Sequence, residues 1–543
     1  MLEWQKIPNV DDRLKWYQNS GKLKLNFFLS VIFVGMILNG YDGSIIAGLQ
    51  ALDPWHEDLG FPSATQIGLL NACGSFSGIL AGPLIAFIDE RFGRRWGIRF
   101  YGYTILIGSV IGCIAGIAGV NGYALFITGR VIIGFGLAAF LMTSMITVQE
   151  ISHPRSRTFV AQSWNSYYII GLTIASFIIL GCSYLSGSWS WRIPYILQVP
   201  LALYVLIGVQ FIPESPRWLL SKGRQEEAFN FLVTYHGNGD REDELVLFEF
   251  EEMKETLQAE AEARAEKWSS IVKTPGSRHR LGLAALMTFL TNVSIPVDRI
   301  MASLTEMPPT FTQLSGSSII YWYYTVIFDQ VGITGASTQT GIAAGLNVFT
   351  WFCQIGATFA SKRIGRRTII LCVWPVLLLC LGGLCATAGV YANSDSSNKA
   401  AGIATVALVW VYLGTFNLSN PVLYSYPAEV QTYAMRTKGL LVWNTLSQCM
   451  GAYVTWVDAI ALDKIDCRSG YKYYGVYMPL VAIQWVLAYK YMLEVKGLTL
   501  EEIHLVFDGP EATAPILNRL SDQEHGDAYR AAEYDSKTSE EGK

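Results

Sequence analysis

The sequence predicts an all-α membrane protein with twelve membrane-spanning helices in two six-helix halves. Hydrophobic residues make up 51% of the 543 residues and charged residues only 15%, whereas about a quarter of the residues in average soluble proteins are charged. A spanning helix needs roughly 20 mostly apolar residues. Such segments can be placed at residues 26–47, 66–88, 100–120, 123–147, 159–182, 193–212, an interrupted one within 281–331, 338–360, 368–391, 401–427, 439–460 and 473–493.

Short charged motifs recur in the same order in the two predicted halves. Three pairs stand at nearly constant spacing along the chain: Asp89–Arg95 with Ser361–Arg367, Glu150–Arg157 with Glu429–Arg436, and Pro213–Leu219 with Glu494–Glu501. Internal repeats of spanning segments are typical of membrane proteins whose two halves enclose a central site. The repeat therefore predicts two similar halves with a substrate pathway between them.

Basic residues mark the loops at one face of the predicted membrane domain. They follow the second, fourth, eighth and tenth segments, whereas the loop Asp53–Ala64 at the opposite face has no Lys or Arg. Because short loops rich in Lys and Arg stay in the cytosol, we expect both termini to be cytosolic. This divides the chain into a cytosolic N-terminus (1–24), a first six-helix half (25–213), a cytosolic helical linker (214–280), a second six-helix half (281–495) and a cytosolic tail (496–543).

Residues Val293–Gln313 interrupt the predicted seventh span with three prolines and the charges Asp298, Arg299 and Glu306. Each charge at mid-bilayer costs about 2.5–3.5 kcal/mol, and proline breaks helix hydrogen bonds. Removing the segment joins Leu281–Asn292 to Leu314–Val331 in one apolar helix of normal length. We interpret it as a translated, unspliced intron, with a genuine re-entrant insertion as the alternative; sequencing the transcript decides between them.

The charges of the repeated motifs are predicted to form a cytosolic gate, in which ion pairs close one access state and break in the other. The alternative is that they only anchor the topology. The predicted gate residues of the first half are Asp89, Arg91, Gly93, Arg94, Arg95, Glu150, Arg157, Glu214 and Arg217. Those of the second half are Arg363, Gly365, Arg366, Arg367, Glu429, Arg436 and Glu494.

Other classes of function find no support in the sequence. The nine cysteines are scattered without the spacing of a metal site, and no nucleophile–base constellation or phosphate-binding loop is present. We therefore expect no metal, no cofactor, no enzymatic activity and no nucleic-acid partner. We expect a monomer surrounded by the lipid bilayer.

Taken together, the motifs resemble those of the sugar porter family of the major facilitator superfamily. They are, in order, Gly40–Gly43, Asp89–Arg95, Gly129–Gly136, Glu150–Arg157, Pro213–Leu219, Arg363–Arg367 and Glu494–Glu502. Pro421–Glu429, Met435–Gly439 and His153–Arg155 look most like the fungal lactose-permease-type branch. The resemblance implies the major facilitator fold and plasma-membrane transport of a disaccharide (lactose-like) or monosaccharide by alternating access. The alternative is a non-transporting sugar sensor of the same fold.

Asp42 is the most informative single residue, because a carboxylate within a span is expensive unless it is paired or carries protons. Its natural partner is Arg130, which is also predicted to lie within the membrane. Proton-coupled sugar porters carry Asp and Arg at these two positions, so the resemblance implies proton symport. The alternative is a static ion pair that only orders the helix bundle.

Sugar recognition needs amides and hydroxyls for the ring hydroxyls and aromatic faces for the apolar ring face. Positions carried over from the family give the candidates Asn165, Gln313, Ser318, Tyr323, Tyr324, Asn347, Thr350, Tyr424, Asn444 and Gln448. If Val293–Gln313 is spliced out, Asn292 takes the position of Gln313. Any of these polar residues could instead stabilise helix packing, by under about 1–2 kcal/mol each.

Overall fold

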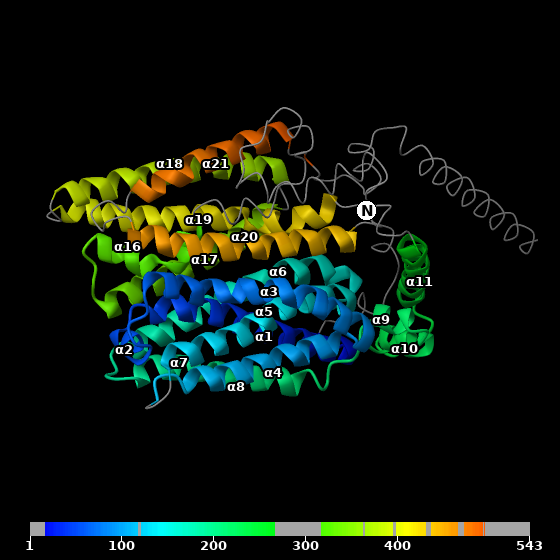
Figure 1. Cartoon of the computed structure of the whole chain (residues 1–543). Coiled ribbons are helices and arrows are strands. Elements are labelled where there is room, and N and C mark those ends of the chain that lie inside the picture. The colour runs from blue at the N-terminus through cyan, green and yellow to red at the C-terminus, as the bar shows by residue number, and fades with distance from the viewer. Residues whose placement is uncertain are drawn as a thin grey trace, which may run out of the picture.

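The computed structural model describes residues 17–117, 121–265, 317–361, 364–394, 398–430, 436–464, 472–491 and 494. Every regular element within these ranges is a helix. The helices form two bundles that lie side by side along their length (Figure 1). The whole of Val293–Gln313 lies outside the described residues, as do the part of the seventh span before residue 317 and the C-terminal tail, so the interpretation of that insertion stays a prediction.

The first bundle follows the predicted spans closely. It contains α1 (Ser20–Leu49), α3 (Ala64–Phe92), α4 (Arg94–Cys113), α5 (Gly122–Ile151), α6 (Pro154–Cys182), α7 (Trp189–Ile196) and α8 (Gln198–Gly208), with the short α2 (Asp53–Asp58) between α1 and α3. The third helix begins six residues before its predicted span because the chain turns sharply at Gly93, whose φ of 97° is accessible to glycine. The sixth span is divided into α7 and α8 at Leu197.

The second bundle repeats this arrangement. It contains α15 (Ser317–Trp322), α16 (Tyr324–Gln330), α17 (Ala336–Ser361), α18 (Arg366–Asn393), α19 (Lys399–Val430), α20 (Arg436–Lys464) and α21 (Lys472–Tyr491). The described part of the seventh span is broken between α15 and α16 at Tyr323, which has the non-helical dihedrals φ −127° and ψ 27°. Within the described ranges, eight helical segments are long and apolar enough to cross a membrane.

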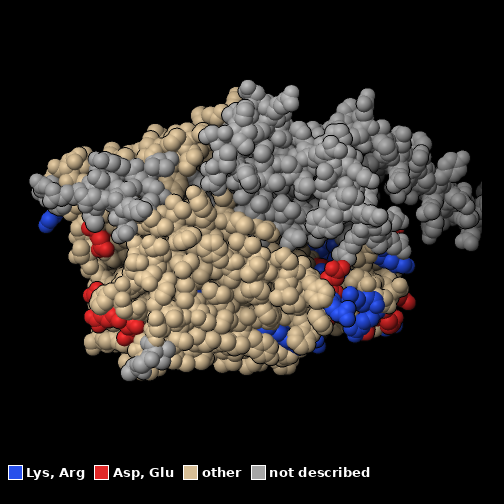
Figure 2. Space-filling view, viewed as in Figure 1, with Lys and Arg blue, Asp and Glu red and all other residues tan. Residues whose placement is uncertain are grey.

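Three helices follow the first bundle: α9 (Pro216–Ser221), α10 (Gln225–Tyr235) and α11 (Glu244–Ala265). They lie together at one end of the molecule (Figure 1). Lys and Arg gather near this end on the visible face, whereas the long middle face shows few charges (Figure 2). Large apolar side chains of the bundles, such as Ile107, Leu379 and Ile403, are more than half exposed, as expected for helices that face lipid.

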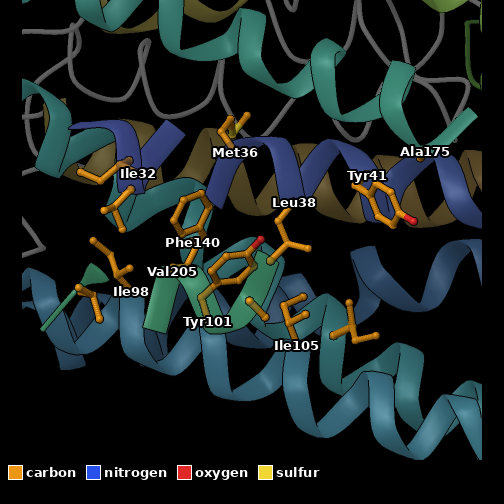
Figure 3. Packing of buried hydrophobic residues seen from close by; sticks show 14 of the residues in the cluster. Ile32, Met36, Leu38, Tyr41, Ile98, Tyr101, Ile105, Phe140, Ala175 and Val205 are labelled. Carbon is orange, nitrogen blue, oxygen red and sulfur yellow. The ribbon is translucent and has the colours of Figure 1, made fainter. Parts of the chain in front are cut away.

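Each bundle packs around its own hydrophobic core. In the first, the rings of Tyr101 and Phe140 stack with their centroids 4.3 Å apart, and Tyr101 Oη donates a hydrogen bond to the carbonyl oxygen of Gly35 at 3.0 Å. Figure 3 shows these rings among Ile98, Ile105 and other apolar side chains. Residues of α10 and α11 join this core. Two separate cores allow each half to move as a rigid body against the other.

Candidate functional site

The two halves meet along two matching helix pairs, α3 with α20 and α6 with α17. Glycines permit the close approach of α3 to α20. A Cβ added at Gly68 would lie 2.6 Å from the Cβ of Ala459, and one at Gly78 would lie 3.2 Å from the Gln448 side-chain carbonyl carbon. Small residues are typical of such interfaces between membrane helices. Each pair joins a helix of the first half to a helix of the second half. A cavity enclosed between the two pairs is therefore a cavity between the halves.

A cavity of about 240 Å³ lies between α1 and α6 of the first half and α15, α16, α17 and α19 of the second. Its polar lining consists of Ser44, Asn165, Tyr168, Ser317, Tyr321, Asn347, Asn417 and Asn420. Its aromatic lining also includes Trp322, Tyr324 and Phe416. Amides, hydroxyls and aromatic faces in one cavity are the groups that recognise a polyhydroxylated ring.

Three of the substrate residues predicted from the sequence line this cavity, namely Asn165, Tyr324 and Asn347. Tyr323 is not among the lining residues, and its hydroxyl donates to the carbonyl oxygen of Thr455 on α20 at 2.7 Å. The Thr350 hydroxyl donates to the backbone of Asn347 at 3.0 Å, one turn away. These two side chains therefore contact helices and not the cavity.

The remaining candidates divide into two groups. Gln448 lies where α20 packs against Gly78 of α3 and is not among the cavity residues. Gln313 lies outside the described residues, as do the side chains of Ser318, Tyr424 and Asn444 on α15, α19 and α20. Their roles as sugar contacts stay predictions.

Several lining residues were missed from the sequence, above all Asn417 and Asn420 on α19. Asn417 is 1% exposed. Their signal was present in the chain: two amides three residues apart within an apolar segment share one helix face, and polar groups buried in membrane helices need partners. Neither residue belongs to a motif that resembles the sugar porter family, so the sequence did not indicate a role for them in substrate binding.

Hydrogen bonds join the two halves on one side of the cavity. Asn347 Nδ2 of α17 donates to Ser176 Oγ of α6 at 2.7 Å, and Ser176 Oγ is 3.0 Å from Ser44 Oγ of α1. Nearby, Gln50 Nε2 at the end of α1 donates to the carbonyl oxygen of Trp322 at 3.4 Å. All lie toward the end of α1 opposite α10, which packs near the start of that helix at Gly21. The halves are therefore tied together at the end remote from α9–α11.

Asp42 and Arg130 form a buried ion pair between α1 and α5. Arg130 Nη1 lies 2.7 Å from both carboxylate oxygens, and the two side chains are 0% and 3% exposed. Asp42 itself does not line the cavity, but the next two residues of α1, Gly43 and Ser44, do. Removing one charge from such a pair leaves an uncompensated buried charge. A proton that binds Asp42 would therefore disturb α1 directly beside the cavity.

Four of the first-half motif charges, namely Asp89, Arg94, Glu150 and Glu214, lie together around Arg94. Arg94 makes a bidentate ion pair with Glu150, with Nε–Oε2 and Nη2–Oε1 distances of 3.1 and 3.0 Å. Glu214 accepts from the Arg94 backbone N–H at 3.1 Å, and burial raises the pKa of its carboxyl. The buried Asp89 accepts from Thr143 Oγ1 at 2.7 Å. Gly93 is required because a Cβ there would lie 2.7 Å from the Glu214 carboxylate.

The second half repeats this arrangement at Glu494. This carboxylate accepts from the backbone N–H groups of Arg366 and Arg367 at 2.9 and 3.1 Å. A Cβ at Gly365 would collide with it, as at Gly93. Each half therefore holds an acidic residue at the start of a helix, where exposed N–H groups favour negative charge.

Other predicted gate residues are placed differently. Arg95 Nη2 donates to the carbonyl oxygen of Gln210 at 2.7 Å, and the Arg91 guanidinium lies 6.0 Å from the centroid of the Phe92 ring. Within the described residues, neither Arg91 nor Arg217 makes an ion pair. Arg363 and the side chains of Glu429 and Arg436 lie outside those residues.

Arg157 pairs with α11 and not with an acid of the motifs. Its Nη2 lies 2.7 Å from Glu249 Oε1, and Glu249 Oε2 lies 2.6 Å from His236 Nδ1. His236 Nε2 is 3.3 Å from the carbonyl oxygen of Ile151 at the end of α5. This triad ties α10 and α11 to the junction of α5 and α6. Glu249 and His236 belong to no repeated motif, and the sequence did not indicate them.

His153, the residue before α6, predicts a pH dependence of stability. Its Nδ1 accepts from the backbone N–H of Arg155, which requires the unprotonated ring nitrogen. Burial, and then His236, Lys22, Arg155 and Arg157, lower the pKa of His153 to about 2. The unfolded chain therefore binds the proton near pH 6.5 and the folded chain does not, so we expect stability to fall by up to about 1.4 kcal/mol per pH unit below that value.

The measurement is thermal unfolding of the purified protein between pH 5 and 7. His153→Asn retains a capping side chain that cannot titrate, and it should flatten this slope. The His56→Asn variant, at a histidine of α2, serves as the control and should keep the wild-type slope. A slope unchanged in His153→Asn would contradict the assignment.

Comparison with known proteins decides the family. The sequence profile of the sugar (and other) transporter family matches residues 28–295 and 299–507. The chain belongs to this family. It is thus a multi-pass membrane transporter of the sugar porter type.

Its curated relatives are similar over most of their length. The transporter is 24% identical to the sugar transport protein MST2 of Oryza sativa, over 90% of this chain and 92% of the relative. It is 24% identical to the low-affinity glucose transporter HXT4 of Saccharomyces cerevisiae, over 88% and 80%. It is 26% identical to a high-affinity glucose transporter of Kluyveromyces lactis, over 86% and 82%.

Solved structures agree on the fold. The inward-open xylose transporter XylE of Escherichia coli superposes with a TM-score of 0.68 at 18% identity, covering 89% of this chain and 99% of XylE. XylE with bound 6-bromo-6-deoxy-D-glucose gives a TM-score of 0.67 at 20% identity, covering 90% and 100%. The transporter therefore has the major facilitator fold, with two six-helix halves.

Proposed function

We propose that this transporter carries a monosaccharide together with protons, by alternating access around the cavity between its halves. The observation that carries the proposal is the buried Asp42–Arg130 pair, one residue from the cavity wall on α1. A carboxylate at that place can exchange a proton and, through α1, change the surroundings of the sugar. XylE, which has the same fold, is described as a proton:xylose symporter.

A monosaccharide is favoured over a disaccharide by two observations. The cavity of about 240 Å³ is smaller than the ~300–1,000 Å³ of sites for drug-sized ligands. The relatives compared above are glucose transporters or a general sugar transport protein. The resemblance of Pro421–Glu429 to lactose-permease-type proteins stays a prediction, and disaccharide uptake is an outcome of the test below.

In the proposed cycle, two sets of contacts alternate. With Asp42 ionised, its attraction to Arg130 holds α1 against α5. Protonation of Asp42 removes that attraction, and the free-energy difference between the two access states changes. The Asn347–Ser176 bond closes the cavity at one end, and the Arg94–Glu150 network at the other end rearranges when that end closes or opens. We place α9–α11 and both termini in the cytosol, and the protein in the plasma membrane as a monomer.

Radiolabelled uptake tests the proposal. The transporter is expressed in cells without endogenous sugar transporters, and hexoses, pentoses and disaccharides are compared at several external pH values. We expect saturable monosaccharide uptake, stimulated by acidic medium and accompanied by proton entry. Specific sugar binding without flux would favour a sensor. Uptake of a disaccharide alone would overturn the choice of substrate class.

A further inference from the structure

Two asparagines of α19 form a fixed amide ladder on the cavity wall. Asn417 Nδ2 donates to Tyr321 Oη at 2.7 Å and to the carbonyl oxygen of Leu413 at 2.8 Å. Its Oδ1 accepts from Asn420 Nδ2 at 2.9 Å. Both amide hydrogens and the oxygen of Asn417 are thus engaged. Asn417 is a buried support whose orientation is set by α15 and by its own helix.

Asn420 is different, because its hydrogen bonds leave one atom available. Its Nδ2 donates to Asn417 Oδ1 and, at 3.5 Å, to Oε1 of the buried Gln354 on α17. These two bonds occupy both amide hydrogens. Within the described residues, Asn420 Oδ1 accepts no hydrogen bond, and the residue is half-buried at the cavity wall. The hydrogen bonds to Gln354 of α17 and Asn417 of α19 therefore hold Asn420 Oδ1, an uncharged hydrogen-bond acceptor, at the cavity.

We propose that Asn420 is a specificity-determining residue that accepts a hydrogen bond from one hydroxyl of the transported sugar. The assignment rests on the proposed function and names a contact within the same cavity. Phe416, one turn earlier on α19, also lines the cavity and offers an apolar face beside the acceptor. A hydroxyl and the adjacent C–H face of a pyranose ring match this combination. An analogue without that hydroxyl leaves Asn420 Oδ1 desolvated and unpaired, so it is rejected.

The test is a double-mutant cycle between Asn420 and the sugar. Competition constants are measured for the best transported monosaccharide and for its series of monodeoxy analogues, in the wild type and in Asn420→Ala. In the wild type, we expect removal of one particular hydroxyl to weaken binding about tenfold. In Asn420→Ala, removal of the same hydroxyl should weaken binding only slightly, while removal of each other hydroxyl should weaken binding as much as it does in the wild type.

Ser419→Ala is the matched control. Ser419 is next to Asn420 on α19, is fully buried, donates its hydroxyl to the carbonyl oxygen of Phe416 and does not line the cavity. This variant should keep the complete wild-type pattern of analogue discrimination. If Asn420→Ala does not reach the membrane in folded form, Asn420→Ser replaces it. Serine keeps a polar side chain at this position, but its hydroxyl is too short to hold an acceptor where Asn420 Oδ1 lies.

The outcomes separate this assignment from the proposed function. If the wild type takes up sugar, but the effects of Asn420→Ala and of removing a hydroxyl are additive for every analogue, the role of Asn420 is overturned and the proposed function is not. Non-additivity confined to one hydroxyl would support it. A wild-type protein that neither transports any sugar of the panel nor gains thermal stability from it would overturn the proposed function, and this assignment with it.

Discussion

Replacement of Asp42 by asparagine should abolish sugar accumulation against a gradient, with a loss of at least about tenfold, while downhill equilibration continues. Asparagine has nearly the same shape but cannot carry a proton. Arg130 Nη1, now 2.7 Å from both carboxylate oxygens, would lose its counter-charge permanently. The measurement is steady-state accumulation of labelled sugar at several external pH values. Accumulation in the wild type should rise as the medium is acidified, and accumulation in the variant should not respond.

Two further variants separate coupling from stability. Asp42→Glu keeps an ionisable carboxylate and should retain part of the pH response. Asp58→Asn removes a carboxylate that accepts a hydrogen bond from Trp191 Nε1 and lies 3.6 Å from Arg192. Asp58 is not among the cavity-lining residues, so this variant should remain coupled. Undiminished accumulation and proton uptake in Asp42→Asn would reduce the Asp42–Arg130 pair to a structural ion pair.

Glu249→Gln should lower the free energy of unfolding by about 3 kcal/mol, because it removes the buried carboxylate that Arg157 and His236 share and leaves the Arg157 guanidinium without its partner. Glu249 is 3% exposed at its side chain and bonds both Arg157 and His236. Thermal or denaturant unfolding of the purified protein measures the loss. Glu251→Gln, at a 60% exposed position two residues further on α11, is the control and should change stability by less than about 0.5 kcal/mol.

The same loss should depend on pH. Burial alone raises the pKa of Glu249, but the charges of His236 and Arg157 outweigh it and hold the pKa below its ordinary value. A carboxyl with a lowered folded-state pKa stabilises the protein above the unfolded pKa of about 4.5, and this contribution disappears as the pH falls through the folded value. The stability difference between wild type and Glu249→Gln should therefore shrink as the pH falls below about 4.5. A constant difference down to strongly acidic pH would contradict this electrostatic account.

Particular residues show why some of the site could be foreseen and some could not. Asp42 and Arg130 are isolated charges in otherwise apolar spans, and isolated intramembrane charges must find each other. The structure places them in contact. Gly93 and Gly365 stood in repeated motifs, and the structure shows a glutamate packed against each. Here the cost of burying charge leaves few alternatives, so sequence patterns suffice.

Other contacts depend on helix rotation, which a sequence pattern does not specify. Tyr323 and Tyr324 are neighbours, but the break between α15 and α16 places Tyr324 at the cavity and Tyr323 against α20. Glu249 and Arg157 are far apart in the sequence, and their contact exists only because α11 folds back onto the junction of α5 and α6. A neutral amide such as that of Asn417 or Asn420 can form hydrogen bonds with many kinds of neighbour. The role of these two residues could therefore not be inferred from residue type.

By itself, the sequence determined the helical membrane fold, the division into two halves and the family of transporters, because hydrophobic length and repeated charged motifs are properties of the chain read in order. Only the tertiary structure decided which polar side chains share the cavity and how they are oriented there. A cavity between two bundles is defined by the rotation and approach of helices from both halves. Hydrogen bonds such as Asn420 to Asn417 or Asn347 to Ser176 exist only after those helices have packed.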